Sequence, residues 1–304
     1  MQTVMRRGSS NEPYATTHTA RIARRPGLPL VWAAGAAAAV AALVACSDSP
    51  TSASTAASST LALADQAFHA AGHVTMYNRL KAALDKAQAT QNGGFGLNMW
   101  GTIVDQSGMV VAVAYTGSKE DDQWQGSRVI SAQKANTAED FSLPTLALST
   151  ANLYSAVQPG GSLFGLQESN PVNTDAAYGG STSDYGTPND YMVGKRIGGI
   201  NVFGGGLALY DDEGNLLGGV GVSGDASCAD HNIAWKVRHL LNLDFVPAGV
   251  DPVVTVKGHT DDNIVYDIDT LTGKSASGWG HPVCNAATEA IGLALPKTYP
   301  IRYH

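Results

Sequence analysis

The sequence contains two cysteine–histidine pairs whose spacing allows two kinds of chemistry. His231 follows Cys228 by three residues, and Cys284 follows His281 by three residues. Two thiolates and two imidazoles are a common ligand set for structural zinc, so these four residues could hold a metal ion. An isolated cysteine pair in an exported protein instead forms a disulfide. Because the first 46 residues, described below, predict export, the sequence favours a Cys228–Cys284 disulfide over zinc.

A glycine-rich stretch in the second half of the chain has the spacing of a dinucleotide-binding loop. Gly219, Gly221 and Gly224 form G-x-G-x-x-G, and Asp244 lies 20 residues after Gly224. Such a loop requires a strand, a helix and a second, parallel strand. Here the first two glycines fall in the return strand of a hairpin, and the helix expected over 225–243 runs directly into Asp244. The sequence therefore disfavours nucleotide binding.

Two hairpins of the same kind predict an antiparallel sheet. Asp105 and Gly108 frame the first turn, and Asp211 and Gly214 frame the second. Aspartate closes the first strand of each hairpin, and glycine can take the positive φ that the turn needs. Apolar residues at helical spacing predict a helix at 74–89. Further helices are expected over 127–141, 144–155 and 225–243, with a long loop over 156–194 that we expect to be functional because of its length.

The first 46 residues have the composition of a bacterial lipoprotein signal peptide. Residues 1–27 carry five arginines against one glutamate, and an apolar run of 18 residues follows over 28–45. The run ends in Leu-Val-Ala before Cys46, which resembles a lipobox, whose cysteine is lipidated and becomes the new N-terminus. An uncleaved anchor is the alternative, because 18 apolar residues just suffice to cross a bilayer. The sequence thus predicts a lipidated Cys46 and an exported protein anchored in the cell envelope.

The residues after Cys46 predict a flexible tether and an acidic domain. Residues 47–60 are rich in Ser, Thr and Ala and lack apolar periodicity. The chain has 19 basic and 26 acidic residues, and without its first 46 residues it keeps 14 and 25, a formal charge of −11. Such a domain repels nucleic acid and anionic lipid headgroups. We therefore expect no nucleic-acid partner, and membrane contact only through the lipid.

Five short motifs follow one another in a specific order along the chain. They are Val104-Asp105-Gln-Ser-Gly108, Lys134-Ala-Asn-Thr137-Ala138, Pro159-Gly-Gly-Ser-Leu163-Phe-Gly165-Leu166, Phe203-Gly-Gly-Gly206, and Gly221-Val-Ser-Gly-Asp225 with Asp230. This order resembles the GlcG/HbpS family of haem-binding proteins, which includes the C-terminal domain of PduO-type proteins. The resemblance covers about residues 74–243. It implies a profilin-like α+β fold, with an antiparallel sheet of about five strands and helices packed on its faces.

The resemblance also implies a domain organisation and a ligand. We expect the haem-binding domain over 61–245 and a C-terminal extension over 246–304 that wraps the core. Haem, or a similar planar molecule, needs an apolar slot, cations for its propionates and usually an axial ligand such as His, Met, Cys or Tyr. The residues that could meet the propionates, a polar edge or the ring are Arg128, Lys134, Thr137, Tyr154, Phe164 and Phe203.

Two histidines are the candidates for the axial ligand of the haem iron. His231 is adjacent to Asp230, whose carboxylate could orient the imidazole ring. His73 lies four residues after His69, so the two could share one helical face. Each candidate has a plainer structural interpretation: His231 could pack in the core beside a capping Asp230, Lys134 could be a solvated helix charge, and the aromatic residues could be ordinary core.

Three functions from different classes agree with these features. The first is an envelope-anchored protein that stores, buffers or presents haem without turning it over. The alternative is a haem-degrading enzyme or an accessory oxidative enzyme that acts on a small metabolite. The third is an interaction protein whose long loop docks a partner. The resemblance also implies a homo-oligomer. Three consecutive acids, Glu120, Asp121 and Asp122, could bind a cation, although such runs are more typical of solvated surfaces.

Overall fold

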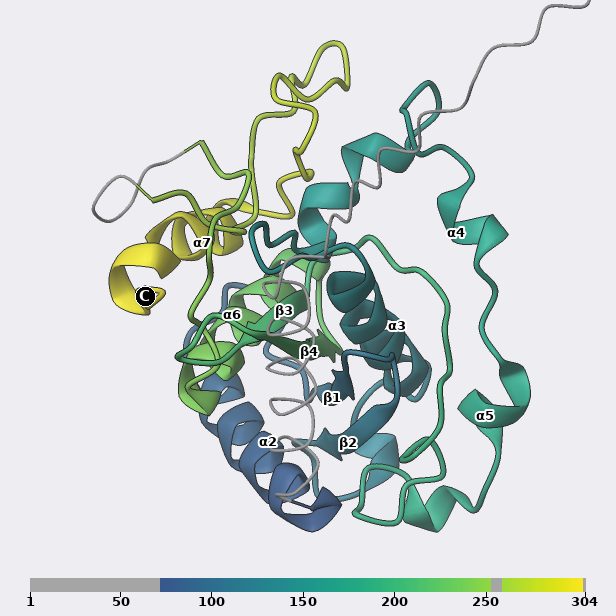
Figure 1. Cartoon of the computed structure of the whole chain (residues 1–304). Coiled ribbons are helices and arrows are strands. Elements are labelled where there is room, and N and C mark those ends of the chain that lie inside the picture. Colours follow the sequence, from purple (N-terminus) through teal and green to yellow (C-terminus); the bar gives the residue numbers. More distant parts are fainter. Residues whose placement is uncertain (1–71, 253–258, 303–304) are drawn as a thin grey trace, which may run out of the picture. The chain divides into compact units, whose positions relative to one another are not determined.

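The structure is a computed structural model that describes residues 72–252 and 259–302, with an antiparallel sheet at its centre (Figure 1). The strands are β1 Trp100–Asp105, β2 Val110–Tyr115, β3 Gly206–Tyr210 and β4 Leu216–Ser223. The helices are α2 His73–Gln88, α3 Ser127–Asp140, α4 Leu166–Ser169, α5 Thr174–Tyr178, α6 Ser227–Leu241 and α7 Ala286–Thr298. The described residues also form the 3₁₀ turns η1 Glu120–Asp122, η2 Thr150–Leu153, η3 Ser155–Val157 and η4 Thr182–Asp184.

The sheet has the strand order β2-β1-β4-β3, and each neighbouring pair is antiparallel. This confirms the predicted α+β class, but the described residues form four strands where we expected about five. The strand-like tail segment 263–268 stays outside the sheet, since its bridges, Val265 with Gly280 and Ile268 with Ser275, are isolated. Gly219 and Gly221 lie within β4, between two antiparallel neighbours. The G-x-G-x-x-G spacing is therefore not part of a dinucleotide-binding βαβ unit.

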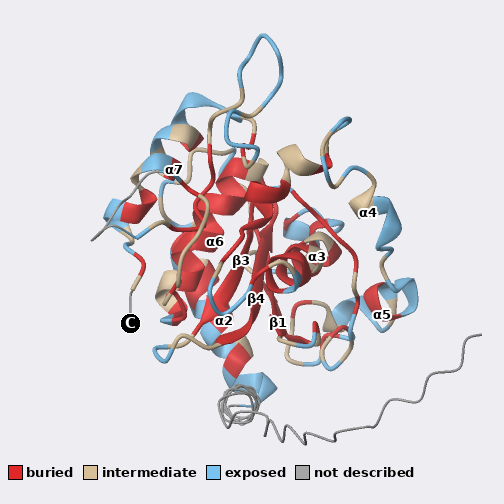
Figure 2. Cartoon of the chain, turned by 45° about the horizontal axis from the view of Figure 1, so that its top comes forward, coloured by how far each residue is buried: buried red, intermediate tan, exposed pale blue. Residues whose placement is uncertain are grey.

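Helices cover both faces of the sheet, which makes the sheet the buried centre of a three-layer fold (Figure 2). α3 packs on one face, and α2 and α6 pack on the other. Successive strand residues point to opposite faces, so Ile103 joins the core under α2 and α6, whereas Val104 joins the core under α3. Since both faces are covered, the strands have near-continuous apolar sequences rather than alternating ones.

The two predicted hairpins are built in the same way. Oδ1 of Asp105 accepts hydrogen bonds from the amides of Ser107 and Met109. Oδ1 of Asp211 likewise accepts from the amides two and four residues further on. Gly108 and Gly214 take positive φ values of 71° and 83°. The turn chemistry read from the sequence is thus the chemistry that forms the hairpins.

Three glycines allow α3 to approach the sheet unusually closely. We call Gly206, Gly219 and Gly221 the glycine seam. A Cβ atom on Gly221 would lie 1.9 Å from the carbonyl oxygen of Ser131, and one on Gly219 would lie 2.2 Å from that of Ala135. No side chain fits between these backbones. The glycine content of this region therefore serves helix–sheet packing.

The helices were predicted with mixed success. α2, α3 and α6 lie within two residues of the expected bounds. The helix expected over 144–155 is wrong, because this segment forms only η2 and the start of η3. Ser149 and Asn152 cap η2 through their side chains, which gives the backbone an alternative to a continuous helix. The predicted loop over 156–194 contains the short helices α4 and α5 and the turn η4.

The C-terminal extension docks on α6. Arg238 donates two hydrogen bonds of 2.7 Å to the carboxylate of Asp262, and both side chains are fully buried. The indole nitrogen of Trp235 donates to the carbonyl oxygen of Tyr299 at 2.8 Å. α7, which the sequence analysis did not anticipate, also packs against α6.

Two expectations concern the membrane. The predicted signal peptide, the tether and the lipidated Cys46 lie outside the described residues. Within residues 72–252 and 259–302, no helix combines the length and apolar character that crossing a bilayer requires.

Replacing Gly221 by alanine tests the glycine seam. A methyl group 1.9 Å from the Ser131 oxygen forces α3 away from β4, so we expect the free energy of unfolding to fall by at least about 2 kcal/mol. Chemical denaturation measures the change. Gly126→Ala is the control, because φ is −60° there and no atom lies within 4 Å of the added methyl. Equal losses in both variants would show that close approach is not the cause.

Candidate functional site

The N-terminal half of α3 lies between two recesses, and each recess takes residues from a different side of the helix. The first recess, which we call the Lys134–Phe203 groove, has a volume of about 300 Å³. Its α3 residues, Ser127, Ile130 and Lys134, are three and four positions apart and therefore share one helical face. The other lining residues are Trp124, Phe203, Ser223, Asp225, Ser227 and Asp230.

A buried ion pair forms the floor of the groove. Nζ of Lys134 lies 2.8 Å from Oδ2 of Asp230 and also donates to the carbonyl oxygen of Val222 at 3.2 Å. Both side chains of the pair are almost completely buried. Burial raises the pKa of Asp230 to about 6, although the positive charge of Lys134 acts in the opposite direction. The Lys134 ammonium is therefore held by the protein rather than left free for a ligand carboxylate.

The two aspartates of the V-S-G-D-x-x-x-x-D motif organise the backbone around the groove. Oδ1 of Asp230 accepts a hydrogen bond from the amide of Asp225 at 2.9 Å. The carboxylate of Asp225 accepts from the amides of Phe95 and Leu97. The motif thus ties the start of α6 to the segment before β1. These hydrogen bonds hold the backbone segments around the groove in place and so fix its shape.

Two aromatic side chains on the groove remain exposed. Trp124 is 57% exposed and Phe203 is 47% exposed. Phe203 precedes three glycines that lead into β3, and Gly205 fits so tightly that a Cβ there would lie 2.4 Å from the carbonyl oxygen of Val222. Exposed rings beside a recess provide apolar surface for a flat ligand.

His231 lies in the core, in a setting unlike that of an iron ligand. Its side chain is fully buried, and Nε2 lies 3.1 Å from Oδ1 of Asn263 and 3.2 Å from the amide nitrogen of Ile264. Burial lowers the pKa of His231 to about 3, so the ring is neutral. His231 lines neither recess, which favours the packed-core interpretation of this residue.

The remaining candidates lie apart from the groove. Thr137 is buried and receives a hydrogen bond from the amide of Asn201, which docks the segment before Phe203. Tyr154 lies beside the ring of His281, with the ring centroids 5.1 Å apart. His73 is exposed at the start of α2, with Nδ1 3.1 Å from the carbonyl oxygen of Val111. Phe164 is 66% exposed on the long loop.

The predicted disulfide is present. Cys228 and Cys284 are joined across a separation of 56 residues and pin the C-terminal extension to the start of α6. His281 completes a cluster in which the possible ligand atoms lie within 4.8 Å of one another, but His231 is not part of it. Paired sulfurs cannot act as thiolate ligands, so the four-residue zinc site is not the arrangement of this structure.

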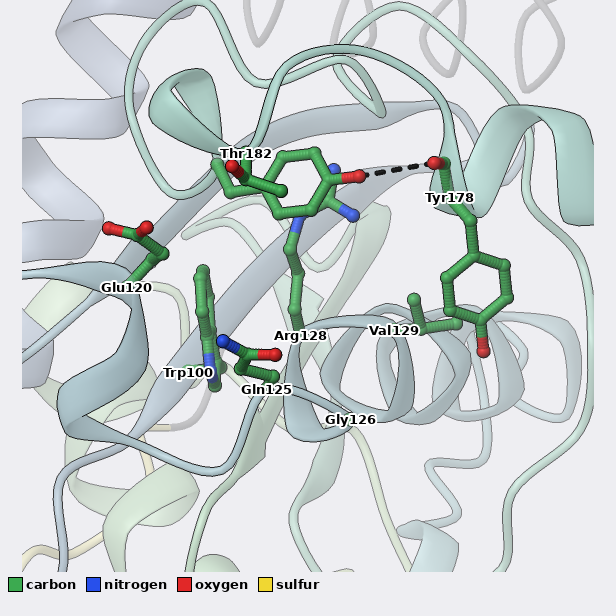
Figure 3. A pocket seen from close by; sticks show the side chains of 9 residues that line it. Trp100, Glu120, Gln125, Gly126, Arg128, Val129, Tyr178 and Thr182 are labelled. Carbon is green, nitrogen blue, oxygen red and sulfur yellow. Dashed lines mark hydrogen bonds between the residues drawn. The ribbon is translucent and has the colours of Figure 1, made fainter.

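The second recess, which we call the Trp100 cavity, lies on the other side of α3 and also measures about 300 Å³ (Figure 3). Its lining residues are Trp100, Glu120, Gln125, Gly126, Arg128, Val129, Tyr178, Thr182 and Tyr185. Three of them, Tyr178, Thr182 and Tyr185, come from the long loop between α3 and β3. This loop therefore builds one wall of the cavity.

Arg128 is held by the protein within this cavity. Its guanidinium donates to both carboxylate oxygens of Asp190 and, at 2.7 Å, to the carbonyl oxygen of Ala177. It also stacks 3.6 Å from the ring centre of Tyr185. The side chains of Arg128 and Asp190 are buried, so the expected contact between Arg128 and a ligand carboxylate is not favoured. Arg128 instead fastens the long loop to α3.

A comparison with known protein families assigns the chain to one of them. A family model described as haem degrading protein HbpS-like matches residues 75–238, more than half of the sequence. The chain belongs to the HbpS-like family. The matched range contains all five motifs, and those motifs supply Lys134, Phe203, Ser223, Asp225 and Asp230 to one groove. The HbpS-like resemblance inferred from the motif order is thereby confirmed.

Two solved structures are similar to this HbpS-like chain. Protein ORFY of Klebsiella pneumoniae is 24% identical, with 54% of this chain and 86% of that chain covered and a TM-score of 0.37. PduOC in complex with haem is 25% identical, with 55% and 91% covered and a TM-score of 0.37. Both TM-scores are low, so family membership rests on the sequence match. No curated protein gives a significant match.

Some residues of the groove could be predicted from the sequence, whereas most residues of the cavity could not. Lys134 and Phe203 were singled out because both belong to family motifs, and the same signal could have identified Asp225 and Asp230. Trp124 belongs to no motif. The walls of the Trp100 cavity come from β1, η1, the start of α3 and the long loop, and no sequence spacing relates these residues.

Removing the charge of Arg128 tests whether this side chain holds the long loop against α3. Arg128→Met leaves the carboxylate of Asp190 buried without its ion-pair partner, so we expect a loss of about 3 to 5 kcal/mol in the free energy of unfolding. Chemical denaturation measures the loss, and the double variant with Asp190→Asn should recover part of it. Arg196→Met, at an exposed arginine bonded to Ser107, should change stability by less than about 1 kcal/mol. A loss of similar size in both variants would contradict this role.

Proposed function

We propose that this protein binds haem, or a similar planar apolar molecule, in the Lys134–Phe203 groove. The observation that carries the proposal is the pair of exposed aromatic rings, Trp124 and Phe203, on a groove built from HbpS-like motifs. Covering these rings with a flat ligand removes apolar surface from water, which stabilises the complex by about 25 cal/mol per Å². The description of the family as haem-degrading supports haem as the ligand.

The groove residues fit the flat, apolar part of haem and do not fit its other parts. The groove lining contains no His, Met, Cys or Tyr side chain that could ligate iron. The lining cation is Lys134, which Asp230 already holds. We therefore assign no iron-ligating or propionate-binding role to any groove residue. What these residues do is stack against the ring and hold the shape of the recess.

The size of the groove supports the proposal that copies of the chain associate. A volume of about 300 Å³ is at the lower end of small-molecule sites, so a porphyrin would keep a large uncovered face. We propose a homo-oligomer in which a second copy covers that face.

We also propose, from the signal-like N-terminus, that the protein is exported and lipid-anchored in the bacterial envelope, where it stores, buffers or presents its ligand.

Titration with haemin tests the proposal. The purified protein should develop a Soret band with saturable stoichiometry, and Phe203→Ala should weaken binding about tenfold because it removes one stacking surface. Phe164→Ala is the matched control, since this ring is 66% exposed but lies outside the groove. The absence of a spectral shift at micromolar haemin, or equal losses in both variants, would refute the proposal.

The haem-degrading alternative has support in the family description alone. It is separable from storage by experiment. With a reductant and oxygen present, a degrading enzyme should lose its haem spectrum faster than free haem does, whereas a storage protein should protect it. Because the ionisable groove residues Lys134 and Asp230 are paired with each other and the lining contains no iron-ligating side chain, we favour storage.

A further inference from the structure

The Trp100 cavity is a second candidate binding site, independent of the groove proposed for haem. The two recesses share no lining residue, because the cavity takes Arg128 and Val129 from α3 and the groove takes the opposite face of the helix. About 300 Å³ of space suits a ligand with a single ring. The chemistry of the cavity walls then indicates which class of ligand fits.

The walls of the cavity are mainly aromatic and apolar. Trp100 is 1% exposed and is fixed by an edge-to-face contact with Tyr115, with ring centroids 5.2 Å apart. Val129 of α3 forms part of the apolar wall. Tyr178 is 61% exposed and lies across the cavity from Trp100 in the view of Figure 3. A ring that enters the cavity can thus contact the exposed ring of Tyr178, while the almost completely covered Trp100 closes the opposite wall.

The positive charge within the cavity is neutralised. Asp190 binds the Arg128 guanidinium through two hydrogen bonds, and both side chains are buried. The amides of Ser127 and Arg128, at the start of α3, already donate to the carbonyl oxygens of Trp124 and Gln125. Neither the arginine nor these first amides of the helix are therefore free to attract an anion.

The rim of the cavity is negative. Glu120 is part of the lining and forms no ion pair with any residue in the described ranges. Nζ of the neighbouring Lys119 lies 2.8 Å from Oδ1 of Asp121, so Lys119 pairs with Asp121 and not with Glu120. The pKa of Tyr115 is raised, first by burial and then by the charges of Glu120 and Asp122. A cation is the charge that this rim favours.

We propose that the Trp100 cavity binds a small primary amine that carries an aromatic ring. The ring packs in the cavity against Tyr178, and the ammonium group faces Glu120. The long loop between α3 and β3, which Arg128 and Asp190 fasten to the helix, then has a ligand-binding role.

Calorimetric titration of the full chain with 2-phenylethylamine, in an amine-free buffer and without haem, tests the proposal. We expect saturable binding, and about fivefold or greater weakening for the neutral analogue 2-phenylethanol, because the latter lacks the charge that pairs with Glu120. Phenylacetate, an anion of similar size, should bind still more weakly. This comparison uses the unaltered protein, so it does not depend on the folding of any variant.

Two variants with matched controls locate the site. Glu120→Gln should weaken amine binding about fivefold or more, whereas Glu213→Gln, at an exposed acid on the turn between β3 and β4, should leave it unchanged. Tyr178→Ala should weaken the binding of both 2-phenylethylamine and 2-phenylethanol, because both carry the ring. Phe164→Ala should not change the binding of either. Absence of binding at millimolar amine, equal affinity for the alcohol, or unchanged affinity in Glu120→Gln would each overturn the proposal.

Discussion

The close approach of α3 to β3 and β4 is the constraint on which the arrangement of both recesses depends. Where the Ser131 carbonyl meets Gly221, no side chain larger than hydrogen fits, so the helix axis is fixed in distance and in rotation. That rotation sends Lys134 to one side of the helix and Arg128 to the other. Gly219 and Gly221, two of the three glycines that suggest a nucleotide loop in the sequence, therefore help to determine where each recess lies.

Buried ion pairs hold the segments that surround this core. Each of three such pairs joins a core helix to a position far away in the sequence, and the pairs are Arg128–Asp190, Lys134–Asp230 and Arg238–Asp262. Burying two charges contributes little net stability compared with apolar packing, but it strongly disfavours any arrangement that separates them. We interpret these pairs as fixing which segments meet. The consequence for function is that these cations are not available to ligands.

Local signals in the sequence predicted much of the fold, and non-local contacts decided the rest. The hairpins and long helices follow from turn residues and from apolar periodicity. The expected helix over 144–155 failed because the side chains of Ser149 and Asn152 compete for its backbone, and α7 was missed although a capping residue precedes it. The role of Arg128 could not be predicted, since its partner Asp190 lies 62 residues away, in a part of the long loop that contains none of the five motifs.

The two recesses show how one helix can present different chemistry on its two sides. In both, the cation nearest to the ligand is neutralised by a buried aspartate, so selectivity depends on what else lines the space. In the groove this is apolar ring surface on Trp124 and Phe203, which favours a flat molecule whatever its charge. In the cavity it is aromatic surface beside the carboxylate of Glu120, which favours a cation. An acidic domain repels anionic ligands, so the proposed binding of haem at the groove would depend on burial of the ring rather than on its propionates.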